Sequence, residues 1–204
     1  CDIDTFSPER RDESLVKELK DGCPERLTIF FPHRHCNEKG IDLVLGAYDI
    51  LSQKLGHQPA IVFAGTGPSL PLVKDAAEKY KHVRYIGFVN SVEEMARYYA
   101  SVDMGLALSG WETFGLSILE SMASGNAIVG AAAGAAYEHV TESGAGTILK
   151  ERTPEALANA IVELFHSDLT EKKAKARKYA EKFSWNDCFK RQLNLYKEIT
   201  GLKK

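Results

Sequence analysis

The stretch DMGLALSGWETFGLSILESMASGNAIVGA, Asp103 to Ala131, holds two short apolar runs with a helical segment between them. The runs Asp103–Ser109 and Ala127–Ala131 have the length and apolar character of buried strands. The segment between them, Leu116–Ser124, has its apolar residues at helical spacing. Neighbouring strands joined through a helix run parallel, so this stretch predicts an α/β fold.

The rest of the chain repeats this alternation. Four further apolar runs predict strands: Arg26–Phe31, Ala60–Gly65, Val83–Phe88 and Ala145–Lys150. Other segments with helical period predict helices: Glu9–Lys20, Glu38–Leu55, Ser69–Tyr80, Ser91–Ala100, Pro154–His166, Leu169–Glu181 and Asn186–Thr200. Ser7 is the expected N-cap of the first helix, and Ser184 or Asn186 that of the last. The pattern predicts a Rossmann-like, doubly wound parallel sheet of about six strands with helices on both faces.

Composition narrows the possible classes of protein. The 204 residues include 26 basic and 28 acidic side chains, a balance that gives no reason to expect a nucleic-acid partner. No apolar run approaches the ~18 residues of a transmembrane helix. The four irregularly spaced cysteines predict reduced thiols in a cytoplasmic protein. The chain opens on CDIDTFSPER without an initiator methionine, so we expect it to be part of a longer protein.

Unusual residues follow each of the first four predicted strands. Arg34 and Lys39 come after the first strand, and Gly65 and Gly67 after the second. Ligands of open parallel sheets bind at the carboxyl ends of the strands, so these loops are expected to face one crevice. Taken singly, each signal is weak, because the glycines do not complete a dinucleotide fingerprint and exposed basic residues are common.

Glu120 stands alone in an uncharged window. It is the only charged residue between Thr113 and Tyr137, where an average composition would place roughly six charges. The predicted helix start at Gly115–Leu116 offers free N–H groups and the positive end of a helix dipole to an anion. With the basic residues of the first loop it would form a diphosphate site. Glu120 could then accept hydrogen bonds from a ribose and Glu112 from a sugar, as a nucleoside-diphosphate sugar requires.

The segment ETFGLSILE, Glu112 to Glu120, resembles the Glu–seven residues–Glu motif of retaining glycosyltransferases of family four, which have the GT-B fold. RHCNEKG at Arg34–Gly40 is similar to the Arg-and-Lys loop of that family. GTGP, VRYIGFV, YYASVDMGLALS, ESMASGNAIVG, GAAYEHV and GAGTILK follow in the family's order, and CDIDTFSP resembles its interdomain segment. FSWNDCFKRQLNLY adds a likeness to mannosyl- and glucosyltransferases that build glycolipids and surface glycans.

The resemblance implies that residues 1–204 form the nucleotide-sugar-binding C-terminal domain of a GT-B enzyme. Residues 1–24 would be the interdomain segment and leading helix, residues 168–204 the C-terminal helices, and the N-terminal acceptor domain would be absent. The whole enzyme would transfer a hexose, with retention, from a donor such as GDP-mannose or UDP-glucose to a glycan or lipid-linked acceptor. The chain alone would be inactive. No cofactor or tightly bound metal is expected, and the location would be cytoplasmic, peripheral to the inner membrane through the missing domain.

The resemblance also assigns roles to residues. Arg34 and Lys39 would bind the diphosphate and Glu112 the transferred sugar, which makes these three the catalytic set. The donor-binding set would be Glu120, Thr113, Phe114, Gly115, Leu116, Gly65, Gly67, Phe88 and Val89. Two departures from the family pattern affect the neighbourhood: His33 replaces a glycine before the arginine, and Ala135 replaces the second of two glycines.

Several alternatives remain open at this stage. A GT-B nucleotide-sugar epimerase shares the fold, and a non-catalytic nucleotide-sugar-binding module would use the same residues. His33, His35 and Cys36 permit a metal hypothesis, in which the two histidines share one face of a strand; histidines that form hydrogen bonds or contact the donor are the default. The basic helical run Glu171–Phe183 would be a solvated face or, less simply, a membrane-surface helix.

Overall fold

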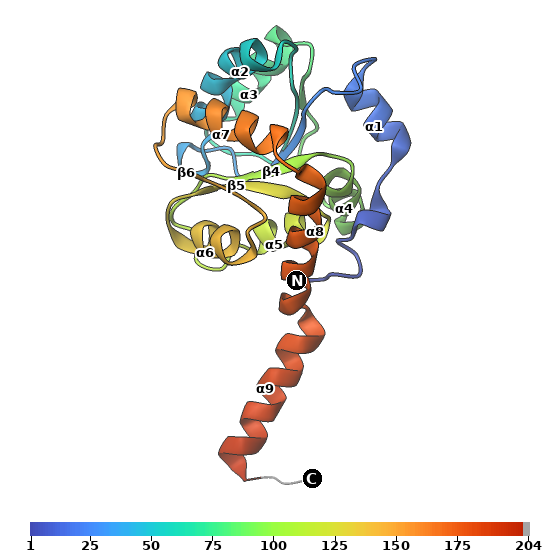
Figure 1. Cartoon of the computed structure of the whole chain (residues 1–204), viewed down its shortest axis with the longest axis vertical. Helices are drawn as coiled ribbons and strands as arrows, with labels where there is room; N and C mark the ends of the chain where they lie inside the picture. Colours follow the sequence, from blue (N-terminus) through green and yellow to red (C-terminus); the bar gives the residue numbers. More distant parts are fainter. Residues whose placement is uncertain (202–204) are drawn as a thin grey trace.

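Six parallel strands form one sheet in the computed structural model, which describes residues 1–201 (Figure 1). The strands are β1 (Thr28–Pro32), β2 (Ala60–Ala64), β3 (Val83–Tyr85), β4 (Met104–Ala107), β5 (Ala127–Ala131) and β6 (Gly146–Leu149). Their spatial order is β3-β2-β1-β4-β5-β6. The direction of winding therefore reverses between β1 and β4, and their carboxyl ends form the topological switch point where α/β sheets bind ligands.

Helices cover both faces of the sheet. They are α1 (Glu13–Lys20), α2 (Ile41–Leu55), α3 (Leu70–Lys79), α4 (Val92–Ala100), α5 (Leu116–Ala123), α6 (Gly134–Ser143), α7 (Pro154–His166), α8 (Leu169–Ala180) and α9 (Trp185–Thr200), with short 3₁₀ turns at Pro8–Arg10, Asn37–Lys39 and Glu181–Phe183. In Figure 1, α2, α3 and α7 lie above the sheet, and α5, α6 and α8 lie below it. The predicted doubly wound α/β fold is confirmed.

Each face of the sheet has its own apolar core, because successive side chains of a strand point to opposite faces. In β1, Ile29 and Phe31 pack with residues of α2, α3 and α7. Phe30, between them, packs with residues of α1, α4, α5, α6 and α8. Strands buried on both faces read as continuous apolar runs, which is why the sequence pattern identified them.

The first predicted helix, Glu9–Lys20, was wrong at its start. Pro8–Arg10 forms only a 3₁₀ turn, and the side chain of Ser7 makes no capping bond. Asp12 is the true N-cap, and its carboxylate accepts hydrogen bonds from the N–H groups of Ser14 and Leu15. At the other end of the chain Ser184 caps α9, one of the two predicted alternatives, by accepting from the N–H of Asp187.

Helix α6 was not predicted at all. Ala133 stands at its N-cap position and offers no side-chain hydrogen bond, so the usual start signal is missing. The preceding alanines and glycines continue the weakly polar composition of β5. Its position is decided by packing instead: Ala136 and Val140 belong to the core on the α5 and α8 side.

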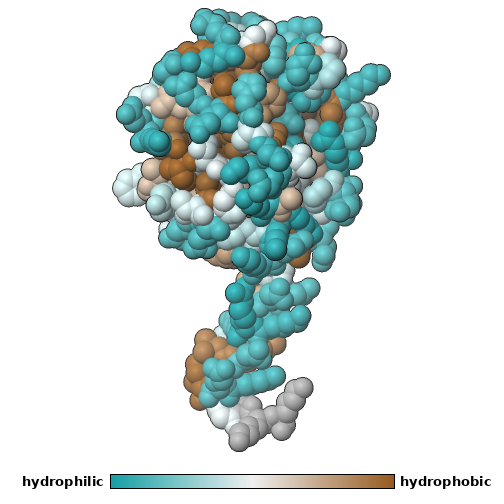
Figure 2. All heavy atoms as spheres, in the orientation of Figure 1, coloured by the Kyte–Doolittle hydropathy of each residue, from teal (hydrophilic) through white to brown (hydrophobic). Residues whose placement is uncertain are grey.

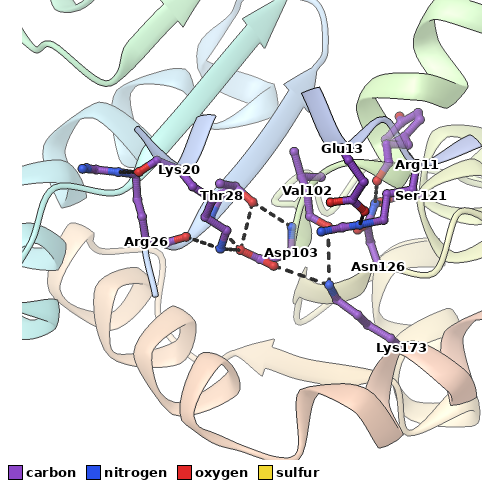
Figure 3. A network of polar contacts seen from close by, with 11 residues as sticks. Arg11, Glu13, Lys20, Arg26, Thr28, Val102, Asp103, Ser121, Asn126 and Lys173 are labelled. Atoms are coloured by element: carbon purple, nitrogen blue, oxygen red, sulfur yellow. Dashed lines mark hydrogen bonds and ion pairs between the residues drawn. The ribbon is translucent and has the colours of Figure 1, made fainter. Parts of the chain in front are cut away.

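A polar network joins α1 to the amino ends of the strands, opposite the switch point (Figure 3). Asp103, just before β4, accepts from Lys20 of α1 at 2.9 Å and from the Thr28 hydroxyl at 2.9 Å. Lys173 of α8 pairs with its other oxygen at 3.5 Å. Burial alone would raise the pKa of Asp103, but the ammonium groups of Lys173 and Lys20 outweigh it and hold the pKa below its usual range.

The basic run 171–183 is not the freely solvated face that the sequence suggested. Besides the pairing of Lys173, Lys172 donates to the Gly144 carbonyl at 2.9 Å. Arg177 donates to the carbonyls of Ile3, Phe6 and Ala123, each at 2.9 Å. Two of these carbonyls, those of Gly144 and Ala123, lie at the C-terminal ends of α6 and α5, where backbone oxygens lack partners within the helix.

Helix α9 extends away from the sheet, and none of its residues is buried (Figure 1). Figure 2 shows apolar surface gathered on one side of this projecting helix. Its exposed large apolar residues are Trp185, Phe189, Leu193, Leu195, Tyr196 and Ile199. Within residues 1–201, no helix combines the length and the apolar character needed to cross a membrane.

Candidate functional site

The switch point between β1 and β4 brings two predicted catalytic residues into contact. Lys39 ends the 3₁₀ turn that follows β1, and Glu112 lies in the loop that follows β4. Because β1 and β4 are hydrogen-bonded neighbours, these loops emerge side by side. Lys39 Nζ donates to Glu112 Oε2 at 2.6 Å, and both side chains are about a quarter exposed, 24% and 28%.

One hollow at this edge brings together the loops after β1, β2 and β3. It is lined by Pro32, His33, Arg34, Gly65, Thr66, Gly67 and Phe88. A second hollow, sharing His33, joins the loops after β1 and β4 to the start of α5. It is lined by His33, Lys39, Ala107, Leu108, Ser109, Glu112, Ser117 and Ile118. The loops therefore lie at the same ends of the strands, as expected, but they line two hollows that share His33 and not one crevice.

The loops after β1 and β2 are held together through their backbones. The N–H of His35 donates to the Thr66 carbonyl at 2.9 Å, and the N–H of Ser69 donates to the His35 carbonyl at 2.8 Å. A Cβ on Gly67 would lie only 2.4 Å from the His35 carbonyl oxygen. Glycine at this position is therefore required by the close approach of the two loops. Arg34 projects from the same loop with an exposed side chain.

The loop between Glu112 and α5 is fixed to α6 at two points. The Glu112 carbonyl accepts from the N–H of Ala135 at 2.8 Å, and the Phe114 carbonyl accepts from His139 Nε2 at 2.7 Å. Glu112 is thus placed by contacts with α6 as well as by its own loop. Ala135, which departs from the family pattern, supplies a backbone N–H that any residue other than proline could provide.

The start of α5 faces the second hollow. Gly115 occupies the N-cap position and Leu116 begins the helix. The first N–H groups of an α-helix have no partner within the helix, so those of Leu116 and Ser117 are open to an anion. Of the predicted donor-binding residues here, Thr113, Phe114 and Leu116 have exposed side chains. In the backbone of Phe114, the carbonyl is already bonded to His139, which leaves the N–H for a ligand.

His33, which the sequence analysis placed outside the predicted catalytic and donor-binding sets, is also a residue of the site. Its Nε2 donates to the Leu106 carbonyl at 3.0 Å, and its ring packs edge-on against Phe31. Burial lowers the pKa of His33 to about 4, so the ring is neutral at pH 7. It lines both hollows, between Arg34 and the pair formed by Lys39 and Glu112. Its place directly after a strand was the available signal.

Glu120 lies deeper along α5 than the rest of the site. Within residues 1–201 its side chain forms no ion pair and no hydrogen bond, whereas Glu112 is paired with Lys39. Burial raises the pKa of Glu120 to about 7, well above the usual range of a glutamate. A half-buried carboxyl without a partner is costly to ionise, which is typical of a group that serves a ligand.

The two remaining donor-binding predictions lie in the loop after β3. Phe88 is 67% exposed and lines the first hollow. Val89 is instead partly buried and packs against the core on the α4 side. The two neighbours therefore face opposite ways, and Phe88 is the one whose side chain can meet a ligand.

The histidines after β1 do not share a strand face, contrary to the sequence expectation. Strand β1 ends at Pro32, so His33 and His35 both lie in the loop. The His35 ring is fully buried and packs edge-on against Phe63 and Tyr85. Over residues 1–201, no group of three or more His, Cys, Asp and Glu side chains has the arrangement of a metal site.

A parallel sheet with its crevice at the switch point defines a Rossmann-like ligand-binding domain. The chain belongs to the glycosyl transferases group 1 family, whose model matches residues 17–183. It is 30% identical over 185 residues to a GDP-mannose-dependent α-(1-6)-phosphatidylinositol dimannoside mannosyltransferase of Mycobacterium tuberculosis, covering 90% of this chain and 47% of that protein. The chain thus spans about half the length of the curated relatives it matches.

Solved structures show the same fold. Sucrose-phosphate synthase from Thermosynechococcus elongatus superposes with a TM-score of 0.79 at 20% identity, over 98% of this chain and 51% of that one. Anabaena HepE in complex with UDP and glucose superposes with a TM-score of 0.75 at 20% identity, over 99% and 55%. The GT-B resemblance inferred from the motifs is confirmed.

Proposed function

We propose that this chain is the donor-binding half of a retaining glycosyltransferase that moves a hexose from a nucleoside-diphosphate sugar to a glycan or lipid-linked acceptor. The observation that carries the proposal is the meeting of Lys39, Glu112 and the start of α5 at the switch point. Cations and free N–H groups there suit a diphosphate, and the neighbouring carboxylate suits sugar hydroxyls. Family membership and the UDP and glucose of HepE support the same ligand class.

Charge is the main contribution of the site to the proposed reaction. Breaking the bond between sugar and diphosphate leaves negative charge on the departing nucleotide. Arg34, Lys39 and the N-terminus of α5 would stabilise that charge at fixed positions, which is the electrostatic form of catalysis. In this proposal the same cations make a tightly bound metal dispensable. His33 is neutral at pH 7, so the side-chain positive charge at the site comes from Arg34 and Lys39.

The donor would lie along the edge of the sheet from β3 to β5. The base would contact the Phe88 side chain and the backbone of Val89, and the ribose would contact Glu120. The diphosphate would contact Gly65, Gly67, Arg34, Lys39 and the backbone of Thr113, Phe114, Gly115 and Leu116. Glu112 would contact the transferred hexose. The likeness to mannosyltransferases favours GDP-mannose, and the UDP bound in HepE favours UDP-glucose, as the first donors to test.

The acceptor would be held by another part of the protein. The curated relatives are about twice as long as this chain, and GT-B enzymes place the active site between two domains. We therefore propose that the chain alone binds donor but transfers no sugar. The free thiols of all four cysteines fit a reducing, cytoplasmic location, with any membrane contact made through the other half.

Calorimetric titration of the 204-residue chain tests this proposal directly. UDP, GDP, UDP-glucose and GDP-mannose are titrated in parallel with inorganic phosphate and the free sugars. One nucleotide pair is expected to bind at micromolar to millimolar concentration, the sugar nucleotide at least as tightly as the diphosphate. Absence of binding by every nucleotide would refute the donor site. Sustained sugar transfer by the chain alone would refute the two-part active site.

A further inference from the structure

His139 of α6 has an unexplained position for a polar residue. It is 5% exposed and lies among the aromatic rings of Phe114, Tyr179 and Phe183. Both of its ring nitrogens nevertheless have partners. Nε2 lies 2.7 Å from the Phe114 carbonyl oxygen, and Nδ1 lies 3.2 Å from the Tyr179 hydroxyl. A residue that only filled space here would be apolar, because burying an imidazole without a role is unfavourable.

The identity of the partners determines where the proton lies. A carbonyl oxygen can only accept, so Nε2 must carry a hydrogen and donate it to Phe114. The Tyr179 hydroxyl has a single hydrogen, and two acceptors lie within its reach, Glu142 Oε2 at 2.9 Å and His139 Nδ1 at 3.2 Å. Burial, together with the Glu142 carboxylate, raises the pKa of Tyr179, so the hydroxyl keeps its hydrogen at neutral pH. The chain of contacts fixes both the plane and the orientation of the imidazole ring.

The bonded carbonyl belongs to the peptide group that joins Phe114 to Gly115. A trans peptide is planar, and its C=O and N–H point in opposite directions. Holding the carbonyl of Phe114 therefore also sets the direction of the Gly115 N–H. The N–H groups of Gly115, Leu116 and Ser117 follow one another at the start of α5. Glycine at position 115 would otherwise leave this peptide free to rotate.

We propose that His139 is a positioning residue of the donor site, holding the Phe114–Gly115 peptide so that its N–H points at the diphosphate. The inference rests on the proposed function, because it assumes that a diphosphate binds at the start of α5. His139 itself does not touch the ligand. It acts through Phe114, and Tyr179 and Glu142 act through His139.

Three substitutions at this position separate positioning from simple packing. In His139→Gln the side-chain amide can reach the place of Nε2 and donate to Phe114. In His139→Asn the shorter amide reaches only the place of Nδ1, near Tyr179. His139→Leu keeps the apolar volume and has no donor. If His139 acts by positioning, only the Gln variant should retain affinity for the diphosphate. If His139 acts only by packing, the Gln and Asn variants should not differ in this way.

The measurement is calorimetric affinity for UDP and GDP beside that for uridine and guanosine. The Leu and Asn variants are expected to bind the diphosphate roughly tenfold more weakly, with Gln within about threefold of the wild type. Affinity for the nucleosides is expected to change less than about twofold. Equal losses for nucleoside and diphosphate, or unchanged diphosphate affinity in the Leu variant, would overturn the inference.

Two further readouts keep the test independent of folding and of the proposed function. If His139→Leu does not fold, Tyr179→Phe is used instead, because it removes only the hydroxyl. It is expected to weaken diphosphate binding two- to threefold and to leave nucleoside binding unchanged. Unchanged affinity for both ligands would overturn the inference. If the wild type binds no nucleotide, the proposed function fails. The NMR resonance of the Gly115 amide then tests by itself whether His139 positions this peptide. A shift in the Leu and Asn variants but not in Gln would support positioning, and an unmoved resonance would exclude it.

Discussion

Lys39 Nζ and Glu112 Oε2 lie 2.6 Å apart although 73 positions separate the two residues in the chain. The cation proposed to bind a diphosphate is therefore already paired with the carboxylate proposed to bind the sugar. A bound diphosphate would compete with Glu112 for Lys39, so the pair limits affinity for the nucleotide while it orients both groups.

The first prediction follows from that competition. Glu112→Gln is expected to increase affinity for the bare nucleoside diphosphate about two- to fivefold, because it frees Lys39 and removes a nearby negative charge. The same variant should lose any extra affinity that the sugar nucleotide has over the diphosphate. Calorimetry with both ligands measures the two effects. A weaker diphosphate complex would contradict the competition between Glu112 and the ligand.

Removal of the site cations should act on the phosphate groups specifically. Arg34→Ala and Lys39→Ala are each expected to weaken diphosphate binding by ~1–3 kcal/mol and nucleoside binding far less. Arg10→Ala is the matched control, because Arg10 is also exposed but lies in the 3₁₀ turn before α1. Equal losses for the two ligands, or an equal loss in the Arg10 variant, would argue against a diphosphate cradle.

Glu120 should make folding stability depend on pH. Burial raises its pKa from 4.5 to about 7, so the folded state holds a proton that the unfolded state releases between these values. Stability contributed by this group is present below pH 4.5 and is lost as pH rises through about 7. Glu120→Gln is therefore expected to be more stable than the wild type at pH 8, by ~1–2 kcal/mol, and equally stable at pH 4.

Urea unfolding at the two pH values measures this difference, and Glu163→Gln on the exposed side of α7 is the control for loss of a charge. In addition, Glu120→Gln should weaken nucleoside binding if the carboxylate accepts from ribose. A variant that is no more stable than the wild type at pH 8 would show that Glu120 is not desolvated in the folded state.

Gly134 controls the position of Glu112 from outside the site. An added Cβ would lie 2.7 Å from the Glu112 carbonyl oxygen and 2.9 Å from that of Gly110, and the backbone has a φ of +63°. Gly134→Ala is expected to cost ~1–3 kcal/mol of stability and to weaken binding of the sugar nucleotide. Gly144→Ala, with a φ of +62° but only a side-chain contact at 4.0 Å, is the control for strain alone. If Gly134→Ala and Gly144→Ala bind the sugar nucleotide with the same affinity, Gly134 does not position Glu112.

Asp103 tests the anchoring of α1 and α8. Asp103→Asn is expected to lose ~2–4 kcal/mol at pH 7, because Lys20 and Lys173 would be left partly buried without their counter-ion. The depressed pKa of Asp103 means that its contribution is present above its usual range and is lost as pH falls below it. The difference from wild type should therefore shrink near pH 3. Asp75→Asn, at an exposed position of α3, should leave the stability unchanged both at pH 7 and near pH 3.

Local patterns predicted most of the fold. Helices with a Pro or Ser start signal, such as Pro154–His166, were located almost to the residue. The strands were located with end errors of up to three residues, the largest at β3, which was predicted to reach Phe88 and ends at Tyr85. The largest helix errors fell where a start signal was missing or misleading, at α6 and at Ser7. Capping preferences are worth about 1 kcal/mol, so tertiary packing overrides them easily.

The site could be predicted only in part. The order of strands and helices placed the loops of Arg34, Lys39 and Glu112 at one edge, because carboxyl ends of parallel strands coincide. Neither the role of His33 nor that of His139 could be read in the same way. Their partners, Leu106 and Phe114, lie 73 and 25 positions away, and only the packed structure brings them together.

The sequence by itself determined the alternation of strands and helices, the family, and the residue types available for charge and hydrogen bonding. These properties reside in short windows, where periodicity and composition act on neighbouring residues. The tertiary structure decided that Lys39 pairs with Glu112, that Glu120 is desolvated, and that His139 holds the loop of the site. Such features depend on strand order and on the exclusion of water, which arise only when distant segments pack against one another.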